Sequence, residues 1–282
     1  MRKRIVYVLG GVVCCAVLAV SLIFQDLGAT TADDVQVIRE GDKEMTVRFK
    51  GEEGLLYKQF NFTFDTPFRD WFGTGKWTTM NLLSPSATDV DAYVKLRRSI
   101  FDGSGDFKDN RIEATGSAAR FSAVAPTGKM FTTKSMVENN DLWFVKGDHL
   151  WFKGRFLLES GVPFTIVDFQ ERGRKQSPGP RITIWERSHI GIELKYRPKP
   201  QLRQLVKPVP IGKWFDLKVH LVLDDESGDV QIWQDDELII NGQMQTLARA
   251  NSLLNALEVG ITATGEAATV LVSEVAISHD PL

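Results

Sequence analysis

The stretch Asp148–Glu159 (DHLWFKGRFLLE) decides the fold class, because its apolar and polar residues alternate with a period of two. Alternation of this kind is typical of a β-strand with one face in the core and the other in solvent. We therefore predict a strand here. Its inward face would consist of Leu150, Phe152, Phe156 and Leu158, and its outward face of His149, Trp151, Lys153, Arg155 and Glu159.

The same pattern recurs in three later segments, which are Arg181–Arg187 (RITIWER), His189–Arg197 (HIGIELKYR) and Trp214–Val222 (WFDLKVHLV). A tryptophan on an outward face leaves a large apolar area in water, so several of them together indicate a surface that something covers. We expect these outward faces to form one basic, tryptophan-lined groove. Its members would be Trp151, Lys153, Arg155, Arg181, Trp185, Arg187, Lys195, Trp214, Lys218 and His220.

Most of the remaining chain also has strand-like patterns separated by glycine- and proline-containing turns, such as Gln176–Pro180 (QSPGP) and Asp224–Gly228 (DDESG). The expected exception is a short helix over Thr246–Ala256 (TLARANSLLNA). Many short strands without alternating helices predict an all-β, two-sheet sandwich of the jelly-roll type.

The N-terminal segment has a different character. MRKR is followed by Ile5–Phe24, which contains no charged residue. A run of this length can be a signal peptide or a membrane anchor, with the basic residues on the cytoplasmic side. We predict a signal or transmembrane helix over residues 1–24, a linker over residues 25–34 and one extracytoplasmic β-domain over residues 35–282, either membrane-anchored or secreted.

Cysteine content and charge narrow the function. Cys14 and Cys15, the two cysteines, both lie in the apolar run, so the exported domain forms no disulfide. The net charge is −2, but the segment Lys146–His220 holds 15 Lys/Arg against 7 Asp/Glu. This asymmetry predicts an acidic partner, and export argues against nucleic acid. The sequence contains no zinc-protease, P-loop or paired Cys/His motif, and we predict no metal site or cofactor.

Several segments resemble the concanavalin A-like jelly-roll superfamily, and within it the heparin lyase I-type polysaccharide lyases. The resemblance is carried by Phe164–Trp185, Ile192–Arg197 (IELKYR), Gly212–Leu223 (GKWFDLKVHLVL) and Gly228–Ile239 (GDVQIWQDDELI). It implies binding of an acidic, uronic-acid polysaccharide and its cleavage by β-elimination.

That reaction requires a group that neutralises the uronate carboxylate, a base that removes the adjacent proton and an acid that protonates the leaving oxygen. Candidate neutralisers are Gln170, Arg155 and Arg181; candidate bases are His149, His189 and His220; the candidate acid is Tyr196. We rank His149 and Gln170 first because both lie in segments that match the family pattern.

Other interpretations are open. The same surface would serve a non-catalytic carbohydrate-binding module or an envelope domain that binds another protein. A paired-carboxylate glycosidase is disfavoured, because no E-x-D-x-x-E array is present. The acidic hairpin of Asp224, Asp225, Glu226 and Asp229 is expected to be a solvated turn, with a Ca²⁺ site as the alternative.

Overall fold

A computed structural model describes residues 32–49, 51–87, 89–104, 108–171, 179–186, 188–195 and 201–282. The predicted signal or anchor over residues 1–24, and most of the linker, lie outside the described residues. No helix in the described part of the chain has the length and apolarity needed to span a membrane.

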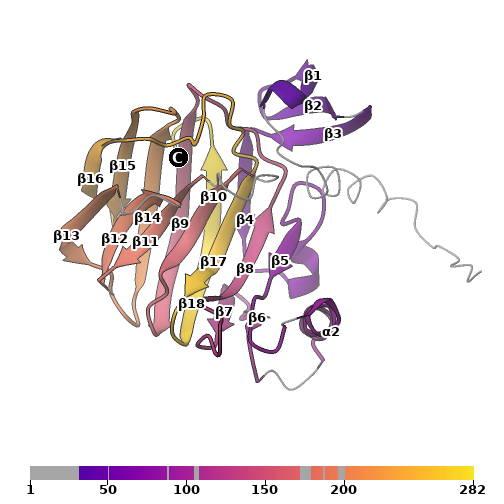
Figure 1. The fold of residues 1–282 in the computed structure, drawn as a ribbon, viewed down its shortest axis with the longest axis vertical. Coiled ribbons are helices and arrows are strands. Elements are labelled where there is room, and N and C mark those ends of the chain that lie inside the picture. Colours follow the sequence, from indigo (N-terminus) through magenta and orange to yellow (C-terminus); the bar gives the residue numbers. More distant parts are fainter. Residues whose placement is uncertain are drawn as a thin grey trace, which may run out of the picture.

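The described chain forms an all-β sandwich of two large antiparallel sheets, which Figure 1 shows as two layers, with a small three-stranded sheet at one end. The seven-stranded sheet consists, in spatial order, of β13 (Leu202–Pro208), β12 (His189–Leu194), β11 (Pro180–Trp185), β10 (Thr165–Gln170), β17 (Ala256–Thr264), β8 (Thr133–Asn139) and β5 (Thr79–Asn81).

The eight-stranded sheet is the second layer. Seven of its strands form the main path, and the eighth, β4 (Gln59–Thr63), pairs with β18 (Ala268–Ser278) outside that path. Its main path runs through β16 (Glu237–Met244), β15 (Gly228–Gln234), β14 (Trp214–Val222), β9 (His149–Ser160), β18 (Ala268–Ser278), β7 (Ala119–Ala123) and β6 (Arg111–Ala114). The small sheet consists of β1 (Gln36–Glu40), β2 (Glu44–Phe49) and β3 (Glu52–Tyr57).

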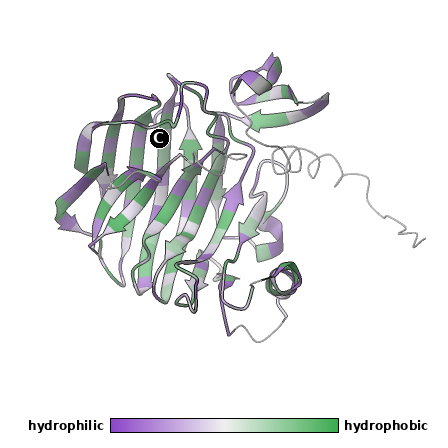
Figure 2. Cartoon of the chain, in the orientation of Figure 1, coloured by the Kyte–Doolittle hydropathy of each residue, from purple (hydrophilic) through white to green (hydrophobic). Residues whose placement is uncertain are grey.

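The core lies between the two large sheets and is built by the alternation seen in the sequence. Figure 2 shows hydrophobic and hydrophilic residues alternating along the strands. Phe152 and Phe156 of β9 and Ile182 and Ile192 of the opposite sheet are fully buried in this core. Each buried aromatic or aliphatic side chain contributes about 1.5–3 kcal/mol relative to exposure, so this alternation provides most of the stability.

Helical structure differs from the prediction. Residues 246–256 form turns rather than a helix, because their buried groups bond to distant parts of the chain: Ser252 Oγ donates to Glu171, and the Thr246 amide donates to the Asp224 carbonyl. The observed helix is α2 (Val90–Phe101), which begins after Asp89, whose carboxylate accepts a hydrogen bond from the Ala92 amide. Two short 3₁₀ turns, at Ala32–Asp34 and Phe68–Trp71, complete the described elements.

Candidate functional site

The residues predicted to line one groove lie on two different sheets. Those on β9 and β14 face outward from the eight-stranded sheet, whereas those on β10, on β11, on β12 and directly after β12 face outward from the seven-stranded sheet. The prediction of a single surface is therefore wrong, because a period of two identifies alternating faces but not the sheet that a strand joins. The first group is His149, Trp151, Lys153, Arg155, Trp214, Lys218 and His220; the second is Gln170, Arg181, Trp185, His189 and Lys195. Arg187 and Tyr196 lie outside the described residues.

On the eight-stranded sheet, the aromatic rings cover one another. The Trp151 and His220 rings stack with centroids 3.9 Å apart and planes 9° apart. Lys218 Nζ lies 5.1 Å from the Trp151 ring centroid and 5.3 Å from that of Trp233. These stacking and cation–π contacts are favourable in themselves. They account for partly exposed tryptophans on this face without a ligand.

The two histidines of this face are also partners. His149 Nδ1 lies 2.9 Å from His220 Nε2, and His220 Nδ1 lies 3.1 Å from Gln231 Oε1. Burial lowers the pKa of His220, and the nearby His149 lowers it further, while the hydrogen bond with Gln231 acts in the opposite direction. Both ring nitrogens of His220 are thus engaged within the protein. This pairing favours a structural role for His220.

The seven-stranded sheet carries a different arrangement on its outward face, which we name the charged row. Its members are direct register partners on five consecutive strands, and they are Glu138 (β8), Glu258 (β17), Asp168 (β10), Arg181 (β11) and Glu193 (β12). Cross-strand partners have Cβ atoms about 4.5–5.5 Å apart, so neighbouring side chains in the row can interact.

The middle of the charged row is buried, although it lies on the outward face. Asp168, Glu258 and Glu138 are only 1%, 2% and 3% exposed. Charged side chains are almost never fully buried unless they are paired, and clusters of them are a common feature of functional sites. This row is therefore the strongest candidate for a functional site in the described part of the chain.

Hydrogen bonds and ion pairs fix the carboxylates of the row. Asp168 accepts hydrogen bonds from the Gln170 side-chain amide at 3.0 Å and from the Thr262 hydroxyl at 2.9 Å. Glu258 forms an ion pair with Lys134 at 3.5 Å, and Arg181 pairs with Glu193. Gln170 is therefore held on the outward face, as its predicted role requires, and not in the core.

Lys195, which directly follows β12, is electrostatically coupled to this row. Burial lowers the pKa of Lys195, and the positive charges of Lys134 and Arg181 lower it further, whereas Asp168 and Glu258 raise it. A lysine with a lowered pKa has a larger neutral fraction near neutral pH than a solvated one. The Lys195 amine is therefore more often in the neutral form, which a general base requires, than the amine of an exposed lysine.

Helix α2 lies beside the β5 end of the row. Arg97 donates a hydrogen bond to Thr79 Oγ1 at 2.8 Å, and Thr79 is the register partner of Glu138. The Tyr93 hydroxyl donates to the Met80 carbonyl at 3.1 Å. Burial raises the pKa of Tyr93, and the Glu138 charge also contributes. The helix therefore adds one cation and one phenol to this end of the face.

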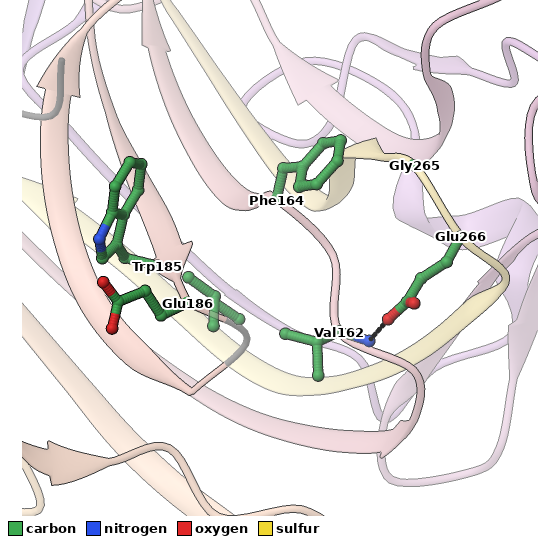
Figure 3. Close-up of a pocket in the computed structure, with 7 residues that line it drawn as sticks. Val162, Phe164, Trp185, Glu186, Gly265 and Glu266 are labelled. Carbon is green, nitrogen blue, oxygen red and sulfur yellow. Dashed lines mark hydrogen bonds between the residues drawn. The ribbon is translucent and has the colours of Figure 1, made fainter.

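A pocket of about 330 Å³ lies at the other end of β10 and β11. Figure 3 shows Trp185 and Phe164 on opposite sides of it, with Val162 between them. Trp185 has the same strand parity as Arg181, whereas Ile184, which also lines the pocket, belongs to the core, so the pocket lies at the strand ends, beside both the outward face and the core.

Comparisons with known proteins give a fold-level answer. No family model and no curated protein matches the sequence. Among solved structures, an endo-β-1,4-glucuronan lyase from the fungus Trichoderma reesei is 17% identical over 77% of this chain and 94% of its own, with a TM-score of 0.49.

Two alginate lyases give similar values. One, a member of polysaccharide lyase family 7, is 12% identical over 73% of this chain and 96% of its own, with a TM-score of 0.46. The other, from Pseudomonas aeruginosa, is 14% identical over 72% and 98%, with a TM-score of 0.44. All three of these solved structures are less than 20% identical to this chain, with TM-scores below 0.5. The finer resemblance to heparin lyase I stays a prediction.

Sequence reasoning missed most of the charged row. Glu258, Thr262 and Thr264 are the polar residues of the otherwise apolar β17, and Lys134 and Glu138 in β8 are four residues apart, as Glu258 and Thr262 are. Polar residues two or four apart within an apolar run share one face of a strand, and this spacing was the signal that could have identified the row. The acidic hairpin, in contrast, behaves as the expected turn: Asp224 Oδ1 accepts hydrogen bonds from the Glu226 and Ser227 amides, and Lys146 contacts Asp224 and Asp225.

Proposed function

We propose that the outward face of the seven-stranded sheet binds a uronic-acid polysaccharide and cleaves it by β-elimination. The observation that carries the proposal is that an amide, a guanidinium group and a lysine of lowered pKa share this face: Gln170, Arg181 and Lys195. These are the chemical groups that the reaction needs for neutralising a carboxylate and for removing the proton beside it.

Gln170 and Arg181 are the proposed neutralisers of the uronate. They lie on adjacent strands, because Asp168 is the register partner of Arg181 and Gln170 is two residues further along β10. The contacts described for Gln170 use one of its two amide hydrogens, which is donated to Asp168. Guanidinium and amide donors bind carboxylates by charge-assisted hydrogen bonds, and this withdraws negative charge from the uronate as the adjacent carbon is deprotonated.

Lys195 is the proposed base. Its neutral amine would remove the proton on the carbon beside the carboxylate, the electron pair would form the carbon–carbon double bond, and the glycosidic bond to the leaving oxygen would break. Tyr196, the next residue in the sequence, is the proposed acid that protonates this oxygen. Lys195 replaces His149 as the candidate base, because His149 lies on the opposite sheet from Gln170.

Asp168 and Glu258 are proposed to position these groups. Asp168 holds the Gln170 amide, and both carboxylates attract the Lys195 amine toward the centre of the face. Positioning by hydrogen bonds of this kind orients the reacting groups before substrate binds.

The direct test uses the full-length chain with heparan sulfate, alginate, glucuronan and hyaluronan, and follows the ultraviolet absorbance of the unsaturated uronate product. We expect an absorbance increase with at least one polymer, and a decrease in turnover of about 10²–10⁴-fold in Lys195→Met, as is typical for loss of a general base. Lys218→Met makes the same exchange on the opposite sheet and should retain full activity. An absorbance increase with none of the polymers would overturn the assignment as a lyase.

A second candidate is hydrolysis by paired carboxylates, and it is favoured by one observation. Asp168 and Glu258 are cross-strand partners, so their Cβ atoms lie about 4.5–5.5 Å apart, and two neighbouring carboxyl groups are the catalytic pair of retaining glycosidases. Hydrolysis creates new reducing ends without an unsaturated product. Measuring reducing ends and absorbance in the same reaction therefore distinguishes the two reactions, and binding without either signal would indicate a non-catalytic carbohydrate-binding module.

We also propose that the β-domain is extracytoplasmic and attached to a membrane or released after cleavage. The support is the sequence of residues 1–24, with its basic start and uncharged continuation. Fractionating cells that express the full chain and sequencing the N-terminus of the product would test both parts. Recovery of the intact chain from the cytosol would contradict the proposal.

A further inference from the structure

His149 and His220 form a hydrogen-bonded pair on the outward face of the eight-stranded sheet, which is the sheet opposite the charged row. They lie on the adjacent strands β9 and β14, where His220 is the register partner of Trp151. His149 Nδ1 and His220 Nε2 are 2.9 Å apart, and the two ring planes are 16° apart. His149 is exposed, whereas His220 is only 8% exposed. One imidazole of the pair therefore reaches solvent and the other is enclosed.

The hydrogen bonds of the pair fix which nitrogen carries each proton. Gln231 Oε1 lies 3.1 Å from His220 Nδ1, and because an amide oxygen can only accept, this Nδ1 donates. In the neutral ring of His220, Nε2 is then an acceptor, so the Nδ1–H group of His149 donates to it. This leaves His149 Nε2 as the nitrogen of the pair that can take up a proton without breaking one of these hydrogen bonds.

The pair can take up one proton without losing a hydrogen bond, but not two. With a proton on Nε2, His149 becomes an imidazolium that still donates from Nδ1, and hydrogen bonds from a charged donor are stronger than neutral ones. A second proton would occupy His220 Nε2, which is the acceptor, so two N–H groups would face each other at 2.9 Å. Groups coupled in this way take up their protons in two separate steps. The second step breaks the pair.

The surroundings of His220 also oppose the second proton. Burial lowers the pKa of His220, and the charges of His149 and Lys218 lower it further, while the Gln231 hydrogen bond and the Asp229 charge raise it. Neighbouring charged side chains from β9, β18 and their ends lie close to one another, as Lys153 with Glu274 at 3.6 Å and His279 with Asp148 at 3.9 Å. Two cations and one carboxylate thus act on the enclosed imidazole.

The His220 ring holds the Trp151 side chain in place. The two rings stack with centroids 3.9 Å apart, and Lys218 Nζ lies 5.1 Å from the Trp151 centroid. A charged His220 would lie near two like charges, those of His149 and Lys218, and its Nε2–H group would face another donor. Rotation of the ring into solvent lets water accept from both of its N–H groups, and it removes the stack from Trp151.

We infer that the His149–His220 pair is an acid-operated switch on this face of the protein. Neutral or with one added proton, the pair holds the His220 ring on Trp151. The second proton separates the two imidazoles and frees the Trp151 side chain. The strands keep their backbone pairing, because the change involves outward side chains and not the core. The switch lies on the sheet opposite the proposed cleavage site and does not depend on that reaction.

The pH range of the switch follows from the position of His220 in the fold. In the unfolded chain its imidazole takes up a proton at the usual value, about pH 6.5. The folded state takes it up at lower pH, because the pKa of His220 is lowered there. The contribution of the pair to stability is therefore fully present above the unfolded value and is lost as pH falls toward the folded one.

Histidine NMR tests the proton count directly, because the chain contains four histidines and each can be assigned by substitution. The full-length chain is labelled with isotope-enriched histidine and titrated with acid. We expect the resonances of His149 and His220 to change in two steps more than about one pH unit apart, with His220 in the lower step. A single common step for both residues would overturn the inference.

A matched pair of variants tests the coupling. His149→Asn keeps a donor near the position of Nδ1, cannot be protonated, and can turn its amide to present an oxygen instead. His220 should then take up its proton about one pH unit higher than in the wild type. His189→Asn removes a histidine from the other sheet and should leave the His220 titration unchanged. The same His220 titration in His149→Asn as in the wild type would contradict the coupling.

Acrylamide quenching of tryptophan fluorescence follows the release of Trp151. We expect quenching to increase in the same pH step as His220 protonation, while the circular dichroism of the sheets stays constant. Trp151→Phe should remove most of the increase. Trp214→Phe changes another outward tryptophan of this sheet, which lies against Arg155, and should keep the increase. An increase that persists in Trp151→Phe, or that accompanies loss of the sheet signal, would overturn the inference.

Discussion

Asp168 on β10 and Glu258 on β17 are direct cross-strand partners, and both side chains are buried on the outward face of the seven-stranded sheet. Two like charges in register are unfavourable unless cations and donors surround them. Here the Gln170 amide, the Thr262 hydroxyl and Lys134 supply these partners. The pair is therefore the centre of a polar network, and removing one member should affect the others.

The first prediction concerns the stability of this network. Asp168→Ala removes the acceptor of the Gln170 amide and the Thr262 hydroxyl, both of which are buried. We expect a loss of about 1–3 kcal/mol in the free energy of unfolding, measured by urea denaturation. Asp168→Asn keeps one acceptor oxygen and should lose less. Equal stability of the alanine variant and the wild type would show that the network does not hold these groups.

A second prediction concerns the pH dependence of turnover. The proposed base, Lys195, must be neutral, so activity should rise with pH through a pKa below the usual lysine range. The Asp168 charge raises the pKa of Lys195, so Asp168→Asn removes this contribution and should lower that pKa further. The rising limb of the pH–rate profile should then move to lower pH. A shift to higher pH, or none, would argue against Lys195 as the base.

A third prediction concerns the dependence of stability on pH. Burial raises the pKa of the Asp141 carboxyl to about 7 from its usual value of 3.8. The folded state therefore binds a proton that the unfolded state releases between these two values, and the stabilisation from this proton is lost as pH rises toward 7. A difference of about three pH units corresponds to roughly 4 kcal/mol as an upper bound. Asp141→Asn should flatten the decline in urea midpoints between about pH 4 and pH 7, whereas Asp216→Asn should leave that decline in place.

A fourth prediction uses two glycines with positive φ. Gly260 in β17 has φ +123°, and a Cβ atom there would lie 2.8 Å from both Phe121 Cδ1 and the Ser135 carbonyl oxygen. Gly116 has φ +88° and no atom within 4 Å of such a Cβ. Gly260→Ala adds core overpacking to backbone strain and should cost at least about 2 kcal/mol, while Gly116→Ala should cost about 1 kcal/mol. Comparable thermal shifts for the two variants would contradict the close packing at Gly260.

The fifth prediction separates structure from binding on the eight-stranded sheet. Trp151→Ala removes the stack on His220 and one face of the Lys218 contact. We expect a loss of about 1–2 kcal/mol in stability, with unchanged affinity for any acidic polysaccharide. If Trp151→Ala instead loses affinity but keeps its stability, the polysaccharide binds on the eight-stranded sheet.

The comparison of sequence and structure shows where local pattern is sufficient. The alternation in Asp148–Glu159 predicts β9 and its inward residues Leu150, Phe152, Phe156 and Leu158, all of which are buried. The local pattern does not predict strand β13, because its residues do not alternate: Val206 and Leu205 are exposed, while Gln204 is buried. Its pairing with β12 at the edge of the sheet stabilises it instead.

Helix α2 is another element that the local sequence pattern does not predict. The inward stripe of α2 consists of only Tyr93, Leu96 and Ile100, while Val90 and Val94 are apolar but exposed, so apolar residues occur on more than one side of the helix. Residues 246–256 look helical in sequence, but their buried hydrogen bonds to Glu171 and Asp224 are made with distant segments. Local propensity is a weak preference that such tertiary contacts override.

The sequence by itself determined that this is an all-β sandwich, and which side of each regular strand faces the core, because side-chain alternation in a strand is local and fixed by the backbone. Only the tertiary structure decided which outward faces lie together. It placed Trp151 and His220 on one sheet and Gln170, Arg181 and Lys195 on the other, and it aligned Glu138, Glu258 and Asp168 from segments far apart in the chain. Sheet order and register arise from long-range pairing, and a period of two along one strand contains no information about the identity of its neighbours.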